Sequence, residues 1–299
     1  KGADIYVADN ASTDDSISFM NSQFPEVKII KNTSNDGYAK GYNEALKQVD
    51  TDVFCLLNSD IEVTPNWLSP IIAEFENNKD TSIIQPKILD YNNKSYFEYA
   101  GAGGGFIDKY GYAYCRGRIF DTIEKDQGQY DDTTPIFWAS GACFFIRKSA
   151  FVTLKGFDES YFAHFEEIDL CWRAYNLDFT TKYVGASTVY HVGGATLNAV
   201  NPKKTYLNFR NSLCTLTKNA EGALFMIIFT RLTLDGIAAL KFLFSLKLAH
   251  FWAVLKAHFN FYTHLPRLLK QRKQLPKKKK YYETTSIVWT YFVRNRRSY

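Results

Sequence analysis

The 299-residue sequence has only five cysteines, and none of them belongs to a pattern that marks a zinc site or a disulfide framework. They are odd in number and far apart, and no Cys-x-x-Cys motif occurs, so a reduced, cytosolic compartment is favoured over a secreted one. The sequence also lacks a Walker A loop and a Gly-x-Gly-x-x-Gly fingerprint, and its first residues are expected to lead directly into a strand and not to form a signal peptide. Charged residues interrupt the apolar region Glu221–Tyr262, and its longest uncharged stretch, Gly222–Thr230, is far shorter than the ~18 residues that span a bilayer. Interfacial or packing helices are therefore expected there.

Apolar and aromatic residues are plentiful, at 46% and 16%, which is enough to bury a full core. The net charge of +5 conceals an asymmetry along the chain. Residues 1–199 carry 17 Lys and Arg against 28 Asp and Glu, a net charge of −11, whereas residues 200–299 carry 19 against 3, a net charge of +16. An acidic body with a basic appendage is expected, and the appendage suits an anionic surface such as phosphate, nucleic acid or membrane.

Short β-branched runs alternate with helical patterns in the first part of the chain. Strands are expected at Ile5–Ala8, Val27–Ile30 and Val53–Leu57, and helices at Asp14–Gln23, Ala39–Gln48 and Trp67–Asn77. This alternation predicts a doubly wound α/β sheet of parallel strands, in which ligands bind beyond the carboxyl ends of the strands. The region 83–149 is less regular and typical of long functional loops. Later elements are expected at Ala142–Arg147 (strand), about Glu166–Tyr175 (helix), Lys182–Val184 and Thr188–His191 (strands).

Two carboxylates and one imidazole follow predicted strands. Asp60 ends the run Leu56–Asp60, and hard oxygen ligands of this kind suit Mg²⁺ or Mn²⁺ bridging phosphates, although a turn or cap before the next helix is an alternative. His191 lies at a strand end, where an imidazole could complete a metal site begun by Asp60. Asp9 also follows a strand and could accept hydrogen bonds from a ribose or a base.

The segment Tyr161–Arg173 is the most informative stretch. Glu166 and Glu167 stand at the start of a predicted helix, after an aromatic run that would raise the pKa of a carboxyl group towards the range of a general base. A structural interpretation explains part of it, because acids are favoured at a helix N-terminus and Asp169 and Arg173 form an i,i+4 pair.

A second loop enters a helix between Asn35 and Asn43. Its glycines, Gly37 and Gly41, would let backbone N–H groups approach an anion. They would serve equally well in a turn followed by a close helix contact, so the loop alone does not decide between the two.

Together these residues resemble family 2 glycosyltransferases with the GT-A fold, of the bacterial rhamnosyltransferase-like branch. Seven motifs occur in order: Asp9–Asp14, Asn35–Asn43, Leu57–Asp60, Ala139–Ala142, Gly156–Glu159, Glu166–Arg173 and Val189–His191. The resemblance implies a Rossmann-like mixed sheet flanked by helices over residues 1–220, followed by an apolar and basic helical extension over residues 221–299. The family's first strand and helix have no counterpart before Asp9, so an N-terminal truncation is expected.

The resemblance also implies an activity and roles for particular residues. A sugar would pass, with inversion, from a nucleotide-diphospho-sugar to a hydroxyl of a glycan or lipid-linked acceptor in cell-surface polysaccharide synthesis. The donor would be bound by Asp9, Asn10, Asn35, Gly37 and Asn58, with Arg210 clamping the departing diphosphate. A divalent cation, Mg²⁺ or Mn²⁺, would be held by Asp60 and His191, and the sugar and acceptor pocket would be lined by Trp138, Ser140 and Gly141. The base would be Glu167; because the family usually has Asp there, Glu166 and Asp169 remain candidates.

Other functions fit the sequence less well. A catalytically silent sugar-nucleotide or glycan-binding subunit is the alternative, but it would be favoured only if the acidic constellation were broken. A sugar-1-phosphate nucleotidyltransferase would need a Gly-rich loop near its start and a second metal-binding acid, and neither is found. Lys277–Lys280 is short and belongs to no nucleic-acid-binding module, so nucleic acid is not an expected partner. Residues 222–299 suit the anionic inner face of the plasma membrane instead, with the protein cytoplasmic and peripherally bound.

Overall fold

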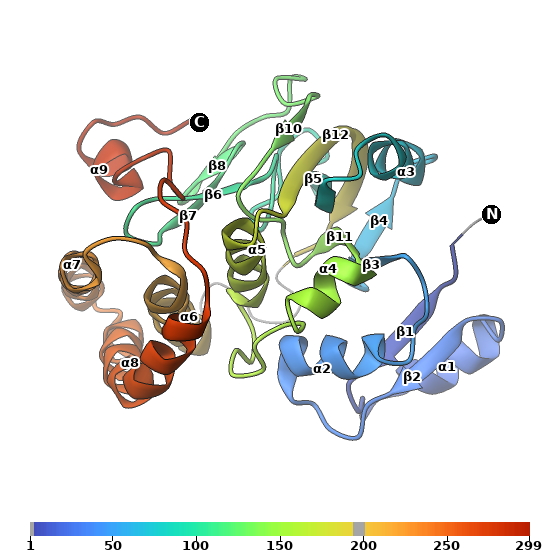
Figure 1. The fold of residues 1–299 in the computed structure, drawn as a ribbon, viewed down its shortest axis with the longest axis horizontal. Coiled ribbons are helices and arrows are strands. Elements are labelled where there is room, and N and C mark those ends of the chain that lie inside the picture. Colours follow the sequence, from blue (N-terminus) through green and yellow to red (C-terminus); the bar gives the residue numbers. More distant parts are fainter. Residues whose placement is uncertain (1–2, 194–200) are drawn as a thin grey trace.

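The computed structural model describes residues 3–193 and 201–299, which form an α/β body with a layer of helices on one side (Figure 1). The strands are β1 (Tyr6–Asp9), β2 (Lys28–Lys31), β3 (Val53–Leu57), β4 (Ile61–Val63), β5 (Thr81–Asp90), β6 (Gly105–Ile107), β7 (Ala113–Cys115), β8 (Arg118–Ile119), β9 (Thr122–Ile123), β10 (Thr133–Pro135), β11 (Cys143–Arg147) and β12 (Thr180–His191). The helices are α1 (Ser16–Gln23), α2 (Gly37–Leu46), α3 (Leu68–Asn77), α4 (Lys148–Thr153), α5 (Glu166–Asn176), α6 (Pro202–Asn219), α7 (Leu224–Phe244), α8 (Leu248–Gln274) and α9 (Ile287–Phe292).

The central sheet is mixed. Its strands run in the order β10-β12-β5-β11-β3, and β4 pairs with β12. Strands β5 and β12 are parallel, whereas β11 is antiparallel to both β5 and β3. The mixed sheet implied by the family resemblance is confirmed, and the wholly parallel sheet predicted from the alternation is wrong. The chain reaches β11 through residues 91–142 and not through a helical crossover, so nothing forces a parallel entry into the sheet.

A single long strand, β12, replaces the two short strands expected near its ends. Its register against β5 shifts between Val184 and Thr188, and this irregularity breaks the apolar pattern in the sequence. Beyond it, β12 pairs antiparallel with β4, so that His191 lies opposite Ile61. The end of β12 is thereby brought beside the turn between β3 and β4.

The three helices predicted in the first part of the chain and the helix predicted at about Glu166–Tyr175 are confirmed, with ends that differ by at most two residues. Helix α5 packs against the sheet and contributes the fully buried Trp172 to the main core, where it joins Leu56, Ile83 and Phe144. The core therefore lies directly behind α5.

The region expected to consist of loops contains a second, four-stranded antiparallel sheet in the order β6-β7-β8-β9. The C-terminal segment returns to this sheet after α8. There the Ile287 backbone N–H donates to Asp108 Oδ2 (2.9 Å), and the Tyr299 ring lies 5.3 Å from the Phe106 ring. This sheet is too short-stranded for its pattern to stand out in the sequence.

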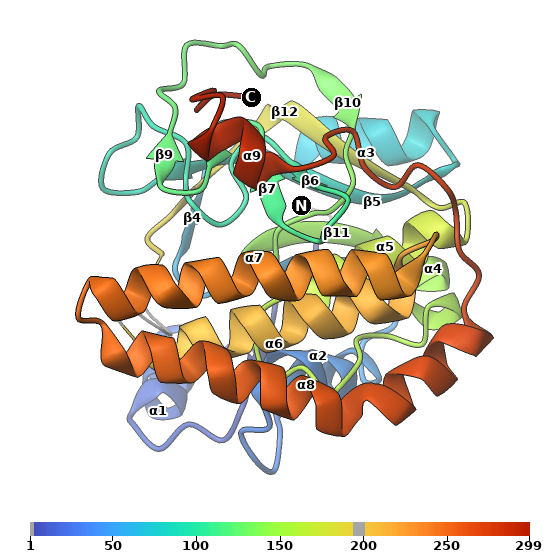
Figure 2. The same cartoon turned by 90° about the vertical axis from the view of Figure 1, so that its left-hand side faces the viewer.

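Residues 221–299 are largely helical, as expected. Figure 2 shows α7 and α8 lying across one side of the molecule, with α6 behind them. Among the described residues, no helix combines the length and the hydropathy needed to cross a membrane.

Candidate active site

Asp60 and His191 are 131 positions apart in the numbering, and β4 brings them together. The Val192 backbone N–H donates to Asp60 O (3.1 Å), and His191 Nε2 lies 3.2 Å from Asp60 Oδ1. His191 is buried, whereas the Asp60 side chain keeps 23% of its surface exposed. A carboxylate and an imidazole nitrogen on one open edge match the donors that Mn²⁺ and Mg²⁺ accept when phosphate and water complete their coordination. No cluster of three or more His, Cys, Asp or Glu side chains suited to a metal is found in the described part of the chain.

Glu98 is a residue of this site that sequence reasoning missed. Its Oε1 lies 3.4 Å from Nδ1 of His191, and the residue is only 6% exposed. It belongs to no strand or helix, and the sole sequence signal is an acid within the aromatic run Tyr96–Tyr99. A charged residue inside such a run is rarely buried without a partner, which is a usable signal.

The glutamates at the start of α5 share a desolvated site. Glu166 is buried and Glu167 is half-buried, and one carboxylate oxygen of each has no hydrogen-bond partner among the described residues. Burial raises the pKa of Glu167 to about 7. Burial, followed by the neighbouring charge of Glu167, raises the pKa of Glu166 well above its ordinary range. Both carboxyl groups therefore hold a proton more readily than an ordinary glutamate, and Glu167 does so in the range useful to a general base.

The backbone before α5 explains how these acids are presented. His164 and Phe165 both have positive φ, 69° and 72°. Asn211 on α6 stabilises this conformation, because its Nδ2 donates to the carbonyls of Ala163 (2.9 Å) and His164 (2.7 Å). Two consecutive left-handed residues are strained, and they turn the chain sharply into the helix.

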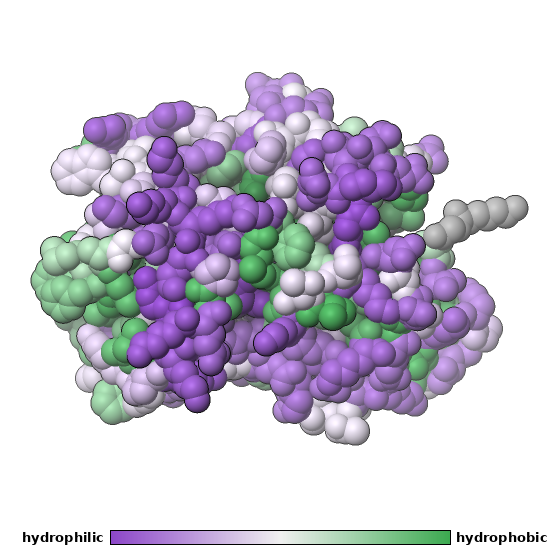
Figure 3. All heavy atoms as spheres, viewed as in Figure 1, coloured by the Kyte–Doolittle hydropathy of each residue, from purple (hydrophilic) through white to green (hydrophobic). Residues whose placement is uncertain are grey.

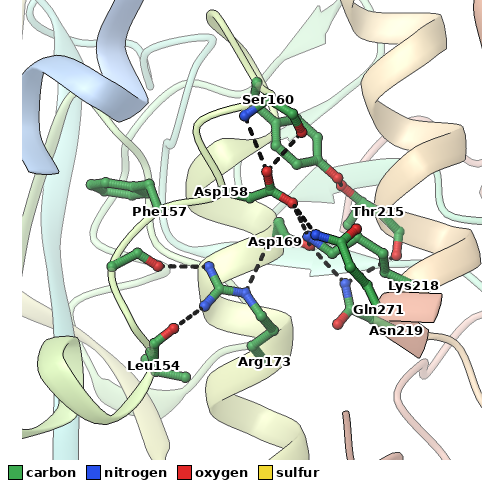
Figure 4. Close-up of polar contacts among 12 residues, drawn as sticks. Leu154, Phe157, Asp158, Ser160, Asp169, Arg173, Thr215, Lys218, Asn219 and Gln271 are labelled. Carbon is green, nitrogen blue, oxygen red and sulfur yellow. Dashed lines mark hydrogen bonds and ion pairs between the residues drawn. The ribbon is translucent and has the colours of Figure 1, made fainter. Parts of the chain in front are cut away.

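Asp169 is placed in a separate, buried network (Figure 4). Its carboxylate accepts hydrogen bonds from Arg173 Nε (2.9 Å), Lys218 Nζ (3.0 Å) and Asn219 Nδ2 (2.8 Å), and the side chain is fully buried. These three donors occupy the carboxylate, and its full burial leaves no access for an incoming hydroxyl. We therefore assign Asp169 to the support of α5 and not to the base.

The expected pocket residues divide between the site and the core. Gly141 lies beside the acids, because a Cβ built there would be 3.8 Å from the carboxyl carbon of Glu167 and Tyr38 Oη donates to Gly141 O (2.8 Å). Ser140 is buried and its Oγ accepts from Ala142 N. Trp138 is 2% exposed and its indole N–H donates to Phe106 O (2.8 Å), so we assign it to the core and correct its placement in the pocket wall.

The expected nucleotide-binding residues near the N-terminus form a cluster of hydrogen bonds. Asn10 Oδ1 accepts from Asn32 (2.6 Å) and its Nδ2 donates to Gly37 O (3.3 Å), which joins the loop after β1 to the start of α2. Asp9 is buried and accepts from the Ser12 backbone N–H (3.1 Å). The cluster is completed by a contact between Asn35 Oδ1 and the backbone N–H of Gly37, while the backbone N–H of Asn58 donates to Ala142 O at the end of β3.

Arg210, expected to clamp a diphosphate, contacts the loop before α5. Its Nε donates to Asn211 Oδ1 (2.7 Å) and its Nη2 to Ser160 O (3.3 Å). It lines a small hollow together with Arg267 of α8. These contacts show Arg210 supporting the same loop that Asn211 holds.

Comparison with known proteins identifies a family and several relatives. A model of the family described as glycosyl transferase family 2 matches residues 1–154. The N-acetylglucosaminyl-diphospho-decaprenol L-rhamnosyltransferase of Mycobacterium tuberculosis is 24% identical over 202 residues, which are 62% of this chain and 66% of that protein. Rhamnosyltransferase WbbL of Escherichia coli is 28% identical over 158 residues, 52% of this chain and 59% of that protein. The chain thus spans less than two thirds of the length of these relatives.

A solved structure shares the fold. The crystal structure of GalNAc-T7 with UDP, GalNAc and Mn²⁺ superposes with a TM-score of 0.55 at 14% identity, covering 72% of this chain and 42% of that one. The central mixed sheet with flanking helices is therefore a known arrangement. Since the family match extends over more than half of the residues, this chain belongs to glycosyl transferase family 2.

Proposed function

We propose that the protein is an inverting glycosyltransferase that moves a sugar from a nucleotide-diphospho-sugar to a hydroxyl of a glycan or lipid-linked acceptor, in cell-surface polysaccharide synthesis. The observation that carries the proposal is Glu167, a half-buried carboxylate with a pKa of about 7 and an oxygen without a hydrogen-bond partner among the described residues. Such a group accepts a proton near neutral pH, and its unpartnered oxygen is free to take one from a bound hydroxyl. Burial and the charge of Glu167 also raise the pKa of Glu166, and a protonated Glu166 would spare Glu167 a like charge.

The transfer itself follows from these assignments. Glu167 accepts the hydroxyl proton of the acceptor while the hydroxyl oxygen forms a bond to the anomeric carbon. The bond from that carbon to the diphosphate oxygen breaks on the opposite face, and the nucleoside diphosphate leaves with the electron pair. Positioning and electrostatics supply most of the rate in such a reaction. We propose that Gly141, which has no side chain between Tyr38 and Glu167, leaves room for the sugar or the acceptor, with Ser140 shaping the wall behind it.

For the donor, we propose that Asp60 and His191 hold a divalent cation, Mg²⁺ or Mn²⁺. The separation of 3.2 Å between their nearest polar atoms and the exposure of Asp60 support this assignment. When bound, the cation would neutralise charge on the diphosphate. Asp9, Asn10, Asn35, Gly37 and Asn58 would meet the nucleotide, and Arg210 would hold the loop before α5 while its remaining N–H groups stay available to the diphosphate.

The open sheet edges support a further strand in the full-length protein. Within residues 3–193 and 201–299, β1 pairs only with β2, and β3 pairs only with β11. Each therefore has a free edge, and Cys55 in the middle of β3 is exposed. Unpaired strand edges are normally covered. We propose that a strand preceding Lys1 lies between β1 and β3 and joins the two sheets.

Helix α7 supports a membrane-facing surface because its polarity is inverted. Its protein-facing side contains the buried ion pair between Arg231 Nε and Asp235 Oδ1 (2.8 Å), with Arg231 3% and Asp235 0% exposed. Its outer side carries Phe225, 78% exposed, and Phe244, 82% exposed. A helix with charges inside and phenylalanines outside is not packed for water. Figure 3 shows hydrophobic residues gathered at the left edge of the molecule, where α7 lies.

Helix α8 continues this surface with exposed Leu248, Trp252 and Phe259. Lys241, Lys247 and Lys256 lie exposed on and between the two helices. Apolar side chains flanked by lysines match an anionic leaflet, where each lysine near the surface contributes ~1 kcal/mol. We propose that α7 and α8 dock the protein peripherally on the cytoplasmic face of the plasma membrane, where a lipid-linked acceptor is found.

The catalytic proposal is tested with E167Q. Sugar nucleotides are first screened for thermal stabilisation in the presence of Mn²⁺, and transfer is then measured with the donor that binds. E167Q should abolish transfer and keep donor affinity, whereas E76Q, at an exposed position of α3, should match the wild type. Loss of donor affinity in E167Q would refute the base assignment.

The membrane proposal is tested by co-sedimentation with phosphatidylglycerol vesicles. A double variant, F225E and F244E, should lose binding, while V152E, at a 62% exposed position of α4, should keep it. Equal binding of both variants would refute this surface as the contact.

A further inference from the structure

His191 stands between two carboxylates that face different nitrogens of its ring. Asp60 Oδ1 lies 3.2 Å from Nε2, and Glu98 Oε1 lies 3.4 Å from Nδ1. The two nitrogens lie on different sides of the imidazole ring, so a cation held by Nε2 and Asp60 would be out of reach of Glu98. Glu98 therefore contacts the His191 ring and would not be a ligand of the cation.

The two carboxylates, of Asp60 and Glu98, also differ in how deeply they are buried. Glu98 and the His191 ring are each only 7% exposed at the side chain, while Asp60 is 23% exposed. The open side of the imidazole is thus the Nε2 side, and Glu98 closes the protein side. A buried carboxylate beside an imidazole nitrogen favours a proton on that nitrogen.

Glu98 is itself held in place by its surroundings. Its Oε2 accepts a hydrogen bond from the Ala100 backbone N–H (2.6 Å). Gly193 has a φ of +69°, and a Cβ built there would lie 3.0 Å from Glu98 Oε1, so the glycine keeps space for the carboxylate. Lys204, on the first turn of α6, is a cation close enough to interact with Glu98. Burial lowers the pKa of Lys204, and the negative charge of Glu98 partly offsets this lowering.

We propose that Glu98 is a positioning residue that keeps the proton of His191 on Nδ1, so that the Nε2 lone pair is presented beside Asp60 to a divalent cation. This inference rests on the proposed metal-dependent function. It adds a residue that no motif of the sequence contained. Outer partners of metal-binding histidines fix ring orientation and tautomer, and their loss lowers metal affinity by about 10- to 100-fold.

The test measures Mn²⁺ affinity by electron paramagnetic resonance of the free ion, with full-length chains and no substrate. E98L keeps a similar volume and removes the acceptor, so it should weaken Mn²⁺ binding by about 10- to 100-fold. E98Q keeps an acceptor oxygen and should fall between E98L and the wild type. E62Q is the matched control, because Glu62 lies two residues from Asp60 but its exposed carboxylate pairs with Lys94.

A second readout separates positioning from general structural damage. In histidine-labelled, metal-free protein, ¹⁵N NMR should show His191 as the Nδ1–H tautomer in the wild type and in E98Q, and a shift towards Nε2–H in E98L. The signal is assigned by its loss in H191Q. Because E98Q preserves the shape of the side chain, it keeps the test valid even if E98L does not fold.

The outcomes distinguish this inference from the function on which it rests. Wild-type Mn²⁺ affinity in E98L and E98Q, together with weakened binding in D60A, would overturn the role of Glu98 alone. An Nε2–H tautomer in the metal-free wild type would do the same. Unchanged affinity in D60A as well would show that the proposed metal site itself is wrong.

Discussion

Replacing Lys218 by Met tests the buried ion network that holds α5. The Lys218 side chain is 2% exposed, and its Nζ lies 2.7 Å from Asp158 Oδ2 and 3.0 Å from Asp169. Asp169 would keep its bonds to Arg173 and Asn219, but Asp158 would keep only neutral donors, from Ser160 and from Gln271 Nε2 (3.2 Å). The variant therefore leaves the carboxylate of Asp158, which is only 14% exposed, without a counter-charge (Figure 4).

The expected cost follows from that uncompensated charge. Removing one partner of a buried ion pair destabilises a protein by about 3–5 kcal/mol. This is a large share of a total stability of roughly 5–15 kcal/mol. The free energy of unfolding, measured in urea, should fall by that amount in K218M, and K256M, at an exposed lysine of α8, should stay within about 0.5 kcal/mol of the wild type.

A double variant and a pH series sharpen the measurement. Adding D158N removes the orphaned charge, so K218M with D158N should recover part of the loss. Burial alone would raise the pKa of Asp158, but Lys218 outweighs it and holds that pKa below the ordinary value of 3.8. The stabilisation from this pair is thus present above pH 3.8 and is lost as the pH falls towards the depressed pKa, so the gap between K218M and the wild type should narrow there. A loss under ~1 kcal/mol, or a gap independent of pH, would refute the reasoning.

Three further predictions follow from the site, the loop before α5 and the membrane-facing helices. Because burial raises the pKa of Glu167 to about 7, the transfer rate should rise with pH to a plateau above that value. The protonated side chain also stabilises the fold at low pH, and this stabilisation is lost as the pH rises through 7. In urea titrations, E167Q should therefore unfold at a higher urea concentration than the wild type at pH 8 and at the same concentration near pH 4. G37A should destabilise the fold by more than ~1 kcal/mol, because Gly37 has a φ of +90° and a Cβ there would lie 2.1 Å from Phe162 O. G236A, inside α7, should stabilise the fold by roughly 0.5–1 kcal/mol, because a Cβ there would have no atom within 4 Å. Both are measured by thermal melting, and equal shifts in the two variants would contradict the close contact between Gly37 and Phe162. Raising the salt concentration should weaken vesicle binding and leave a residual attraction from Phe225 and Phe244; binding unaffected by salt would exclude a contribution from the lysines.

Much of the candidate site was predictable because its residues occur in local motifs. Asp60, His191, Glu166 and Glu167 each follow a strand or begin a helix, and a short motif records that position. Glu98 and Lys218 could not be predicted in the same way. Each acts through residues that are distant in the sequence. The aromatic neighbours of Glu98 are its sole local signal, and nothing local indicates that the ammonium group of Lys218 will be buried.

The direction of β11 and the orientation of α7 were not predictable for a related reason. An apolar run indicates that a strand is buried, but not which neighbour it meets or from which end it enters the sheet. Helix α7 has an apolar composition, and only packing shows that Arg231 and Asp235 face Tyr112 and the protein while its phenylalanines face outward. The family resemblance placed Trp138 in a pocket wall, and its indole N–H is instead satisfied within the core.

The sequence by itself determined the order and kind of the first elements, the family motifs and the separation of charge between an acidic body and a basic extension. These properties depend on the period of apolar residues and on residue type, which a chain displays without being folded. The tertiary structure alone decided that the central sheet is mixed, that Glu98 stands behind His191, and that Lys218 joins α6 to α5. The physical reason is that burial and pairing depend on the distance between segments, and such distances arise only when strands and helices pack.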